Sequence, residues 1–370
     1  MEKRYLEPSV LKDLDKKMVF VAGPRQVGKT TFAKKLLPDP KGYLNWDIPD
    51  HREKILRREY PAASMIVFDE IHKYKQWRNY LKGYYDQFQG SVKTLVTGSA
   101  RLDYYRYGGD SLQGRYHFYR MFPFTVKELS ISRSNDFLDL FKLGGFPEPF
   151  LSGSETEARR WTRENRHLLV NEEIISLENV SDTGTLQLLA MRLPELVGSP
   201  LSLNSLREDL QVSHKTISRW VEIFERLYMI FRLSPLGSSK IRAVKKEKKH
   251  YFFDWNTVRE DGARFENMTA LHLYKWVCYK QDSEGLNYDL VYFRDTDGRE
   301  VDFVVTDNLQ PVLLVEVKSS DREISKNLKY LKHKFPDARG VQVSLSGEKD
   351  YISAEGIRVM PGFKFFSMLV

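Results

Sequence analysis

Short apolar runs alternate with amphipathic stretches along the first third of the chain. The runs have the length of β-strands and predict strands over 18–22, 42–47, 65–68, 92–97 and 116–121. The segments between them have the spacing of helices. Alternation of strands and helices is typical of a parallel sheet with helices on both faces. We therefore predict a doubly wound α/β domain here.

A phosphate-binding pattern lies between the first strand and the helix that follows it. The sequence GPRQVGKTT fits G-x-x-x-x-G-K-[ST], in which two glycines let the backbone N–H groups wrap a phosphate. Lys29 would then contact the β and γ oxygens, and Thr30 would bind Mg²⁺ at a helix N-terminus. The predicted ATP-binding residues of this loop are Gly23, Pro24, Arg25, Gln26, Val27, Gly28, Lys29, Thr30 and Thr31.

Polar residues end two other predicted strands of this region. The apolar run at 65–68 leads directly into Asp69 and Glu70, which is the Walker B pattern. Asp69 is expected to hold Mg²⁺, and Glu70 to orient or deprotonate the attacking water. Ser99 follows the strand at 92–97, and ligands of open parallel sheets bind beyond such ends. Thr97 or Ser99 is therefore a candidate for contact with the γ-phosphate or the attacking water, although a serine that caps a helix fits this position equally well.

Five stretches together resemble a widespread family of bacterial and archaeal AAA-type ATPases whose C-terminal half is uncharacterised. They are GPRQVGKTT, VFDE, VTGSA, the stretch from Leu112 to Phe124, and LGGFPE at 143–148. In such ATPases an arginine after the sensor strand can touch the γ-phosphate, in its own subunit or a neighbouring one. The resemblance makes Arg115 the candidate for that role, with a surface arginine as the alternative. A contact across subunits would be compatible with a homo-oligomer.

The middle of the chain predicts a helical lid followed by a winged helix. The ranges 161–177 and 186–197 have helical periodicity, and 201–233 resembles a winged helix-turn-helix in which Ser213 caps the second helix. On that helix the residues expected to face outward are His214, Lys215, Ser218 and Arg219. They fit a DNA-reading helix, but such modules also serve as lids inside ATPases. The basic run at 240–250 is interpreted as a solvated connector.

The last third contains two apolar strands that carry charged residues in a known pattern. Asp302 lies on the first strand and Glu316-x-Lys318 on the second, after a helix predicted over 263–280. This pattern resembles the PD-(D/E)xK restriction-endonuclease-like superfamily. The resemblance implies that Asp302, Glu316 and Glu266 bind Mg²⁺ or Mn²⁺ and that Lys318 positions the attacking water. Glu300 and Val301 stand where the superfamily name has its proline, and the fold also occurs without nuclease activity.

Composition adds limits to these predictions. A chain of 370 residues suggests two or three domains, which we place at 1–130, 131–250 and 251–370. One cysteine, Cys278, and the absence of a long apolar run favour a cytoplasmic protein without membrane segments. The net charge of +8 permits a polyanionic partner.

The sequence thus predicts an α/β protein with three parts: a P-loop AAA-type ATPase, a helical lid plus winged helix, and a restriction-endonuclease-like α/β domain. The expected function is Mg²⁺-dependent ATP hydrolysis coupled to DNA binding or cleavage. The alternative is a nucleotide-dependent switch that regulates a protein partner and keeps an inactive nuclease-like fold.

Overall fold

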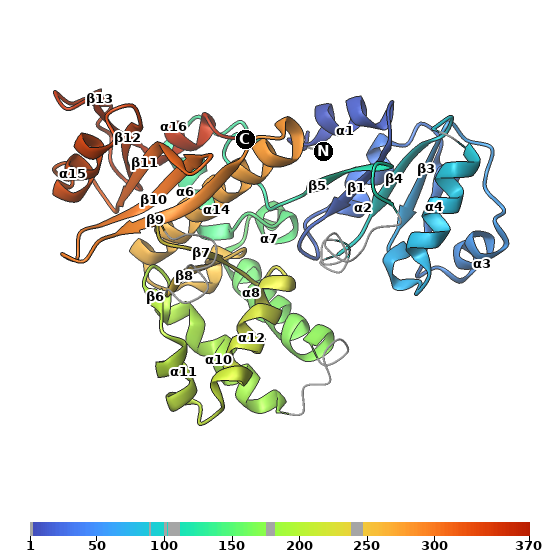
Figure 1. Ribbon diagram of the computed structural model, residues 1–370, viewed down its shortest axis with the longest axis horizontal. Coiled ribbons are helices and arrows are strands. Elements are labelled where there is room, and N and C mark those ends of the chain that lie inside the picture. Colours follow the sequence, from blue (N-terminus) through green and yellow to red (C-terminus); the bar gives the residue numbers. More distant parts are fainter. Residues whose placement is uncertain (1–2, 89, 100–101, 103–111, 175–181, 238–246) are drawn as a thin grey trace. The chain divides into compact units, whose positions relative to one another are not determined.

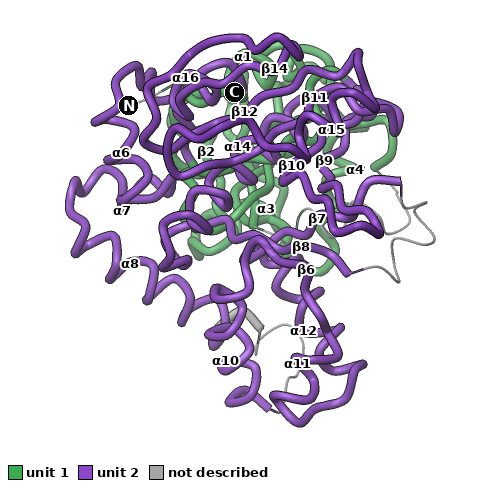
Figure 2. Tube along the Cα trace, turned by 90° about the vertical axis from the view of Figure 1, so that its left-hand side faces the viewer, with its two compact units in different colours: residues 1–123, 282–284 green, residues 124–281, 285–370 purple. Residues whose placement is uncertain are grey.

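A computed structural model describes residues 3–88, 90–99, 102, 112–174, 182–237 and 247–370. Figure 1 shows the ribbon, and Figure 2 colours the two compact units into which the chain divides. Unit 1 comprises residues 1–123 with 282–284, and unit 2 comprises 124–281 with 285–370. No helix among the described residues is long and apolar enough to cross a membrane.

Unit 1 is built on a five-stranded parallel sheet with the strand order β2-β3-β4-β1-β5. Its strands are β1 (Met18–Ala22), β2 (Tyr43–Asn45), β3 (Met65–Asp69), β4 (Lys93–Thr97) and β5 (Tyr116–Arg120). Its helices are α1 (Glu7–Leu14), α2 (Lys29–Leu36), η1 (Pro40–Gly42), α3 (Pro49–Arg57), η2 (Ile71–Lys73) and α4 (Trp77–Phe88). All five predicted strands are confirmed, and their ends differ from the prediction by at most two residues.

Helices cover both faces of this sheet, so the central strands β1 and β3 are buried on both sides. Apolar residues of β1, β3 and β4 that point to one face pack with α3 and α4, as Phe20, Phe68 and Val96 do. The intervening residues point to the other face, against which α1 and α2 pack. The predicted doubly wound α/β architecture is confirmed, and it brings the carboxyl ends of all five strands to one edge.

Unit 2 begins with a helical part. Its elements are α6 (Ser134–Leu143), α7 (Pro147–Ser152), α8 (Glu155–Leu168), a π-helical segment (Leu169–Ile174), α10 (Thr183–Arg192) and η5 (Leu193–Leu196). There follow β6 (Pro200–Leu201), α11 (Leu203–Asp209), α12 (His214–Arg226), β7 (Ile230–Leu233), β8 (Lys248–Phe252) and η6 (Trp255–Thr257). Strands β6, β8 and β7 form a small antiparallel sheet in that order. Ser213 caps α12 by accepting from the Thr216 N–H, as predicted.

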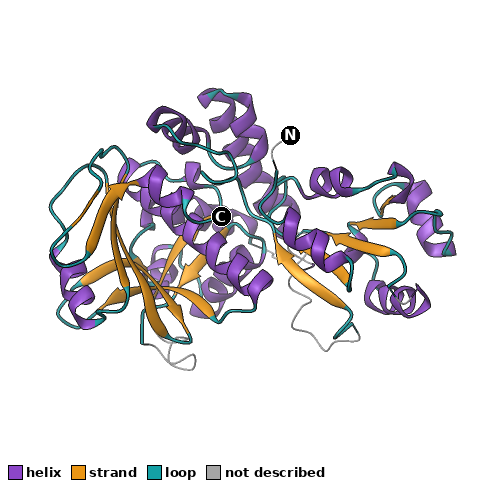
Figure 3. Cartoon of the chain, turned by 90° about the horizontal axis from the view of Figure 1, so that it is seen from above, coloured by secondary structure: helices purple, strands orange, loops and turns teal. Residues whose placement is uncertain are grey.

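The C-terminal part of unit 2 is a mixed six-stranded sheet of order β13-β14-β12-β11-β10-β9. Its strands are β9 (Tyr288–Arg294), β10 (Glu300–Asp307), β11 (Gln310–Lys318), β12 (Arg339–Ser344), β13 (Tyr351–Ile352) and β14 (Ile357–Pro361). Its helices are α14 (Asp261–Glu284), α15 (Lys326–Lys334) and α16 (Gly362–Ser367). Figure 3 shows these strands in orange beside the purple helices. Leu328 and Leu331 of α15 pack on one face of the sheet with Val304 and Leu314.

Candidate nucleotide site and C-terminal acidic cluster

The loop between β1 and α2 has the backbone conformation that a phosphate-binding loop needs. Gly28 has a φ of 94° and Gln26 a φ of 58°, both in the left-handed region. Gly23 has a φ of 153°, and a Cβ built on it would lie 2.0 Å from the Met121 carbonyl oxygen. No side chain fits at Gly23, because β5 ends directly against it. The predicted loop glycines therefore have a steric reason in this fold.

Lys29 is buried at the start of α2 and bends back over the loop. Its ammonium donates to the carbonyls of Gly23 at 3.0 Å and Pro24 at 2.6 Å. Val27 is buried and Arg25 is half-buried, whereas Gln26, Thr30 and Thr31 are exposed. The cation and the helix N-terminus thus stand at the same loop, which is the arrangement that favours an anionic phosphate.

Asp69 is the centre of a hydrogen-bond network at the carboxyl edge of the sheet. Its Oδ2 accepts from the hydroxyl of Thr30 at 2.8 Å, from the phenol of Tyr43 at 2.6 Å and from the amide of Asn45 at 3.3 Å. Its Oδ1 accepts from the hydroxyl of Thr97 at 2.6 Å. Threonine hydroxyl and carboxylate oxygens are ligands that suit Mg²⁺, so Thr30 and Asp69 fit a magnesium ion bound with ATP phosphates.

Tyr43 and Asn45 were not predicted as site residues. They occupy alternate positions of β2, and Asn45 pairs in register with Asp69 of β3. Burial and the neighbouring Asp69 carboxylate raise the pKa of Tyr43 well above its ordinary value. The phenol therefore remains a hydrogen-bond donor throughout the neutral range. The sequence shows only a tyrosine two positions before an asparagine. That pair is not a known motif and does not indicate contact with Asp69 on another strand.

Glu70 has a strained backbone directly after β3. Its φ is 57°, a conformation that is uncommon for a residue with a side chain and that clusters at functional sites. Its carboxylate lies 3.3 Å from the Lys73 ammonium and 3.6 Å from the ring of His72. Burial raises the pKa of Glu70, and Lys73 opposes that shift. A raised pKa suits a residue that accepts a proton from water near neutral pH.

Ser99, the predicted sensor, is buried and lies 3.4 Å from the same His72 ring. Its position beyond β4 is the predicted one. Its side-chain neighbour among the described residues is a histidine that the sequence analysis did not single out.

Arg115 lies at the edge of the sheet opposite the phosphate-binding loop. It directly precedes β5, and its carbonyl accepts from the N–H of Met18 at the start of β1. The loop follows Ala22, four residues further on, which corresponds to roughly 13 Å along a strand. The guanidinium pairs with Asp86 at 2.8 Å. At this distance from the phosphate-binding loop we no longer expect Arg115 to contact the γ-phosphate bound by its own chain. Only the contact across subunits stays a prediction.

Arg4 joins the phosphate-binding loop to the end of β5, and the sequence analysis missed it. This buried side chain donates to the carbonyl of Val27 at 2.8 Å and also to the carbonyl of Phe122. One guanidinium thus fixes two main-chain segments that are far apart in sequence. Arg4 lies in a charged N-terminal stretch that lacks any recognised motif, so no sequence signal distinguishes it.

The predicted charged residues of the C-terminal third come together within unit 2. Asp302 accepts from the N–H of Val317 at 2.8 Å, next to a register shift of β10, and Lys318 contacts Glu316 at 2.8 Å. Burial raises the pKa of Asp302 well above its ordinary value, and the nearby carboxylates of Glu266 and Glu316 raise it further. We call these four residues, Glu266, Asp302, Glu316 and Lys318, the acidic cluster.

Lys249 of β8 supplies a second cation to the acidic cluster. Its fully buried ammonium lies 2.6 Å from Glu300 and 3.5 Å from Glu266, and Tyr251 donates to Glu266 at 2.8 Å. The interpretation of 240–250 as a solvated connector is wrong at its end, because Lys249 and His250 are buried in β8. Residues 240–246 lie outside the described residues.

The acidic cluster does not fit a metal ion as well as the sequence suggests. Glu266 and Glu316 each have a lysine nearby, although Oε2 of Glu316 is buried without a hydrogen-bond partner. Among the described residues, no group of three or more His, Cys, Asp or Glu side chains is arranged to hold a metal ion. Binding of Mg²⁺ or Mn²⁺ by Glu266, Asp302 and Glu316 stays a prediction, and we derive no chemical step through it.

The predicted recognition helix is α12, and its polar residues face outward. His214, Lys215 and Arg219 are exposed, and Ser218 is half-buried with its hydroxyl 3.4 Å from the His214 ring. The opposite face of α12 is buried through Ile217, Trp220, Val221, Ile223 and Phe224. A basic outer face on a firmly packed helix can contact a polyanion without disturbing the core.

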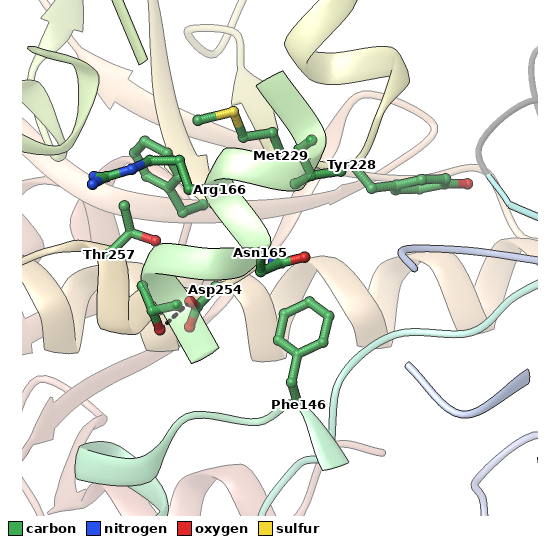
Figure 4. A pocket seen from close by; sticks show the side chains of 10 residues that line it. Phe146, Asn165, Arg166, Tyr228, Met229, Asp254 and Thr257 are labelled. Atoms are coloured by element: carbon green, nitrogen blue, oxygen red, sulfur yellow. Dashed lines mark hydrogen bonds between the residues drawn. The ribbon is translucent and has the colours of Figure 1, made fainter. Parts of the chain in front are cut away.

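Asp254 is one of the residues that line a small cavity in unit 2 (Figure 4). Its volume of about 20 Å³ is enough for one water molecule, and Phe146, Asn165, Arg166 and Tyr228 are among its lining residues. Asp254 accepts from the hydroxyl of Thr162 at 2.7 Å, and burial raises the pKa of Asp254 to about 6. The cavity is too small for a substrate and is a feature of packing.

Comparison with known families agrees with the class that the nucleotide site defines. Residues 15–130 match the family model described as AAA domain, 134–256 match a domain of unknown function (DUF8612), and 261–364 match another (DUF4143). The loop and the parallel sheet agree with this match, so the N-terminal region has a P-loop fold similar to that of AAA domains. The nuclease-like nature of the C-terminal domain is not confirmed, because its family has no assigned function.

The relatives are themselves uncharacterized. A protein of Methanocaldococcus jannaschii is 23% identical over 93% of this chain and 85% of its own length. Another, from Mycobacterium tuberculosis, is 21% identical over 64% of this chain, and the match spans about half, 54%, of that relative.

Solved structures give weaker likenesses. The Aeropyrum pernix ORC1 protein in complex with DNA is 13% identical, with 72% of this chain and 93% of that chain covered and a TM-score of 0.37. A signal transduction ATPase with a tetratricopeptide repeat sensor from Pyrococcus horikoshii is 14% identical, covers 77% of this chain and 48% of that one, and has a TM-score of 0.26.

Proposed function

We propose that this protein is a Mg²⁺-dependent ATPase whose nucleotide cycle is coupled to nucleic acid bound by unit 2. The observation that carries the ATPase part is the 2.8 Å hydrogen bond between Thr30 and Asp69. It joins the end of the phosphate-binding loop to the end of β3, so the two side chains suited to a magnesium ion already lie together.

Each residue of the nucleotide site has a distinct part in this proposal. The N–H groups of the loop and the Lys29 ammonium bind the phosphates, and Thr30 with Asp69 would hold Mg²⁺. The ion, when bound, neutralises charge on the phosphates. Glu70 orients the attacking water and accepts its proton. In this reaction class, positioning and charge stabilisation account for most of the catalysis.

Two substitutions separate binding from turnover. Lys29→Ala should weaken ATP binding, whereas Glu70→Gln should leave binding nearly intact and suppress hydrolysis, because Lys29 contacts ground-state phosphate and Glu70 acts on the water. Binding is measured by calorimetry and hydrolysis by phosphate release. The exposed residues Lys54 and Glu59 provide matched controls as Lys54→Ala and Glu59→Gln. Steady-state hydrolysis at the normal rate in Glu70→Gln contradicts the assignment of Glu70.

The nucleic-acid part of the proposal rests on two features of unit 2. The order of α11, α12 and the antiparallel strands β7 and β8 supports the proposal of a winged helix, in which the exposed Lys215 and Arg219 would approach a phosphate backbone. The acidic cluster, through its member Lys318, would contact DNA as a nuclease-like binding surface. Binding rather than cleavage is proposed, because Lys249 supplies positive charge beside Glu266 and Glu300 that a catalytic metal ion would otherwise bring.

DNA binding and cleavage are tested with the full chain. We expect DNA to stimulate ATP turnover, and DNA affinity to fall with salt and to drop in Lys215→Ala with Arg219→Ala. Incubation of supercoiled, linear, single-stranded and branched DNA with Mg²⁺ or Mn²⁺ should give no cleavage. Cleavage that disappears in both Asp302→Ala and Lys318→Ala would instead establish a nuclease and refute the binding-only proposal.

The second candidate is a nucleotide-dependent switch for a protein partner. The buried Lys249 also favours this function, since a nuclease-like fold with a neutralised cluster can serve as a binding module. Salt-independent or absent DNA binding, together with ATP turnover that DNA does not change, favours the switch.

A further inference from the structure

His72 lies between the catalytic glutamate and the end of β4. Its side chain is fully buried on η2, and its Nε2 is 3.6 Å from Oε2 of Glu70 and 3.4 Å from the hydroxyl of Ser99. The same ring nitrogen is therefore within reach of both side chains. His72 is not among the site residues predicted from the sequence.

Gly98 gives independent evidence that this ring position is built into the fold. A Cβ placed on Gly98 would lie 2.5 Å from Nδ1 and 3.0 Å from Cε1 of His72. The imidazole thus packs against the main chain of Gly98, where only a glycine leaves room. The N–H of Gly98 also donates to the Val21 carbonyl at 3.2 Å, which ties this segment to β1 just before the phosphate-binding loop.

The carboxylate of Glu70 needs such an anchor. Lys73 lies 3.3 Å from Glu70 but also 2.5 Å from Asp47, so this half-exposed ammonium is shared between two carboxylates. The ring of His72, in contrast, is enclosed and cannot move without displacing Gly98. A main-chain bond from the Glu70 N–H to the Thr97 carbonyl at 2.9 Å holds the backbone to the same strand end.

We infer that His72 is a positioning residue for ATP hydrolysis, which holds Glu70 in its working orientation and links it to Ser99 at the end of β4. This inference rests on the proposed hydrolysis by this site. Ser99 then acts on the attacking water indirectly, through the ring and Glu70, and need not touch the γ-phosphate. A change at the end of β4, beside the phosphate-binding loop, passes to Glu70 through the imidazole.

The experiment compares ATP affinity with turnover in His72→Ala, Ser99→Ala and the double variant of the full chain. We expect His72→Ala to lower kcat about 10- to 100-fold, because small misplacement of a catalytic group has effects on that scale. ATP affinity should stay within about twofold, because Glu70, which His72 holds in this inference, acts on the attacking water and not on the bound phosphates. His72→Gln, which retains a polar side chain, should recover part of the rate. The half-buried His117 of β5 serves as the control, as His117→Ala.

The double variant decides whether Ser99 acts through His72. If it does, adding Ser99→Ala to His72→Ala should change kcat no further, whereas Ser99→Ala alone lowers it. Fully additive losses, or normal kcat in His72→Ala, overturn the inference. Absence of ATP hydrolysis in the wild-type chain is a different outcome, because it refutes the proposed function itself.

Gly98→Ala tests the same point in a chain that keeps its histidine. The new methyl group must push the ring away from Glu70, so kcat should fall while ATP affinity is retained. If His72→Ala does not fold, Gly98→Ala and Ser99→Ala still decide: wild-type turnover in both overturns the inference.

Discussion

The phenol of Tyr43 donates a 2.6 Å hydrogen bond to Oδ2 of Asp69, the same carboxylate oxygen that accepts from Thr30. The aspartate that would bind magnesium is thus oriented by β2 as well as by the phosphate-binding loop. Asn45 adds a weaker contact at 3.3 Å to the same oxygen. The strand beside the Walker B strand therefore contributes to the candidate nucleotide site.

Replacement of Tyr43 with phenylalanine should remove one donor while Asp69 keeps the others. We expect the free energy of unfolding to fall by about 1 kcal/mol, the usual net value of one hydrogen bond, and the Mg²⁺ dependence of ATP hydrolysis to change. Urea denaturation and an ATPase titration with Mg²⁺ measure these effects. The half-buried Tyr85 of α4 is the matched control, because its hydroxyl has no hydrogen-bond partner among the described residues. Equal results for Tyr43→Phe and Tyr85→Phe contradict a role for the phenol.

Arg115 can serve a nucleotide site only from a neighbouring subunit, given its place at the opposite edge of the sheet. Mixing Arg115→Ala with Glu70→Gln subunits should then restore part of the ATPase activity, because some interfaces would combine an intact Arg115 with an intact Glu70. Phosphate release from the mixture, compared with each variant alone, is the measurement. A monomeric wild-type protein with full turnover excludes this role.

Lys249 should be required for the stability of unit 2. Lys249→Met leaves the carboxylates of Glu300 and Glu266 without their buried cation, and such a loss is expected to cost about 3–5 kcal/mol in urea unfolding. Adding Glu300→Gln should recover part of that loss, because one uncompensated charge is removed.

A surface pair of the same length provides the control for Lys249. Lys329 and Glu355 also lie 2.6 Å apart, but both side chains are 43% exposed. Lys329→Met should therefore change the stability little. Similar effects of Lys249→Met and Lys329→Met would show that burial of the Lys249 pair does not matter.

Asp254 should make the stability of unit 2 depend on pH. Its pKa is raised to about 6 in the folded protein, above the ordinary value near 4, so the folded state binds more protons between these values. Stability should therefore be highest below pH 4 as far as this group is concerned, and fall by about 3 kcal/mol as the pH rises through 6. Asp254→Asn should remove that part of the pH dependence. The exposed Asp337, changed to asparagine, should leave the pH profile as it is.

The contiguous parts of the nucleotide site could be predicted, because their chemistry is local. Gly23, Gly28, Lys29 and Thr30 belong to one loop, and the apolar run before Asp69 shows that it ends a buried strand. Their relative positions then follow from the edge at which parallel strands end.

The other contacts depend on pairing between distant segments and leave no local pattern. Tyr43 reaches Asp69 through the register of β2 with β3. His72 and Ser99 meet because they follow β3 and β4, which are neighbouring strands. Lys249 looked like the end of a solvated basic run until the fold showed it buried beside Glu300. Arg115 was assigned through a family resemblance that does not fix the subunit it serves, and its place before β5 leaves only the contact across subunits as a prediction.

The bonds from Arg4 to Val27 and Phe122 bear on where a minimal ATPase fragment can begin. The family match starts at residue 15, which leaves out both Arg4 and α1. A fragment cut at that boundary would keep every motif residue and still lose the guanidinium that holds the phosphate-binding loop to the end of β5. We therefore expect a working ATPase fragment to begin at or before residue 4, ahead of the border that sequence similarity draws.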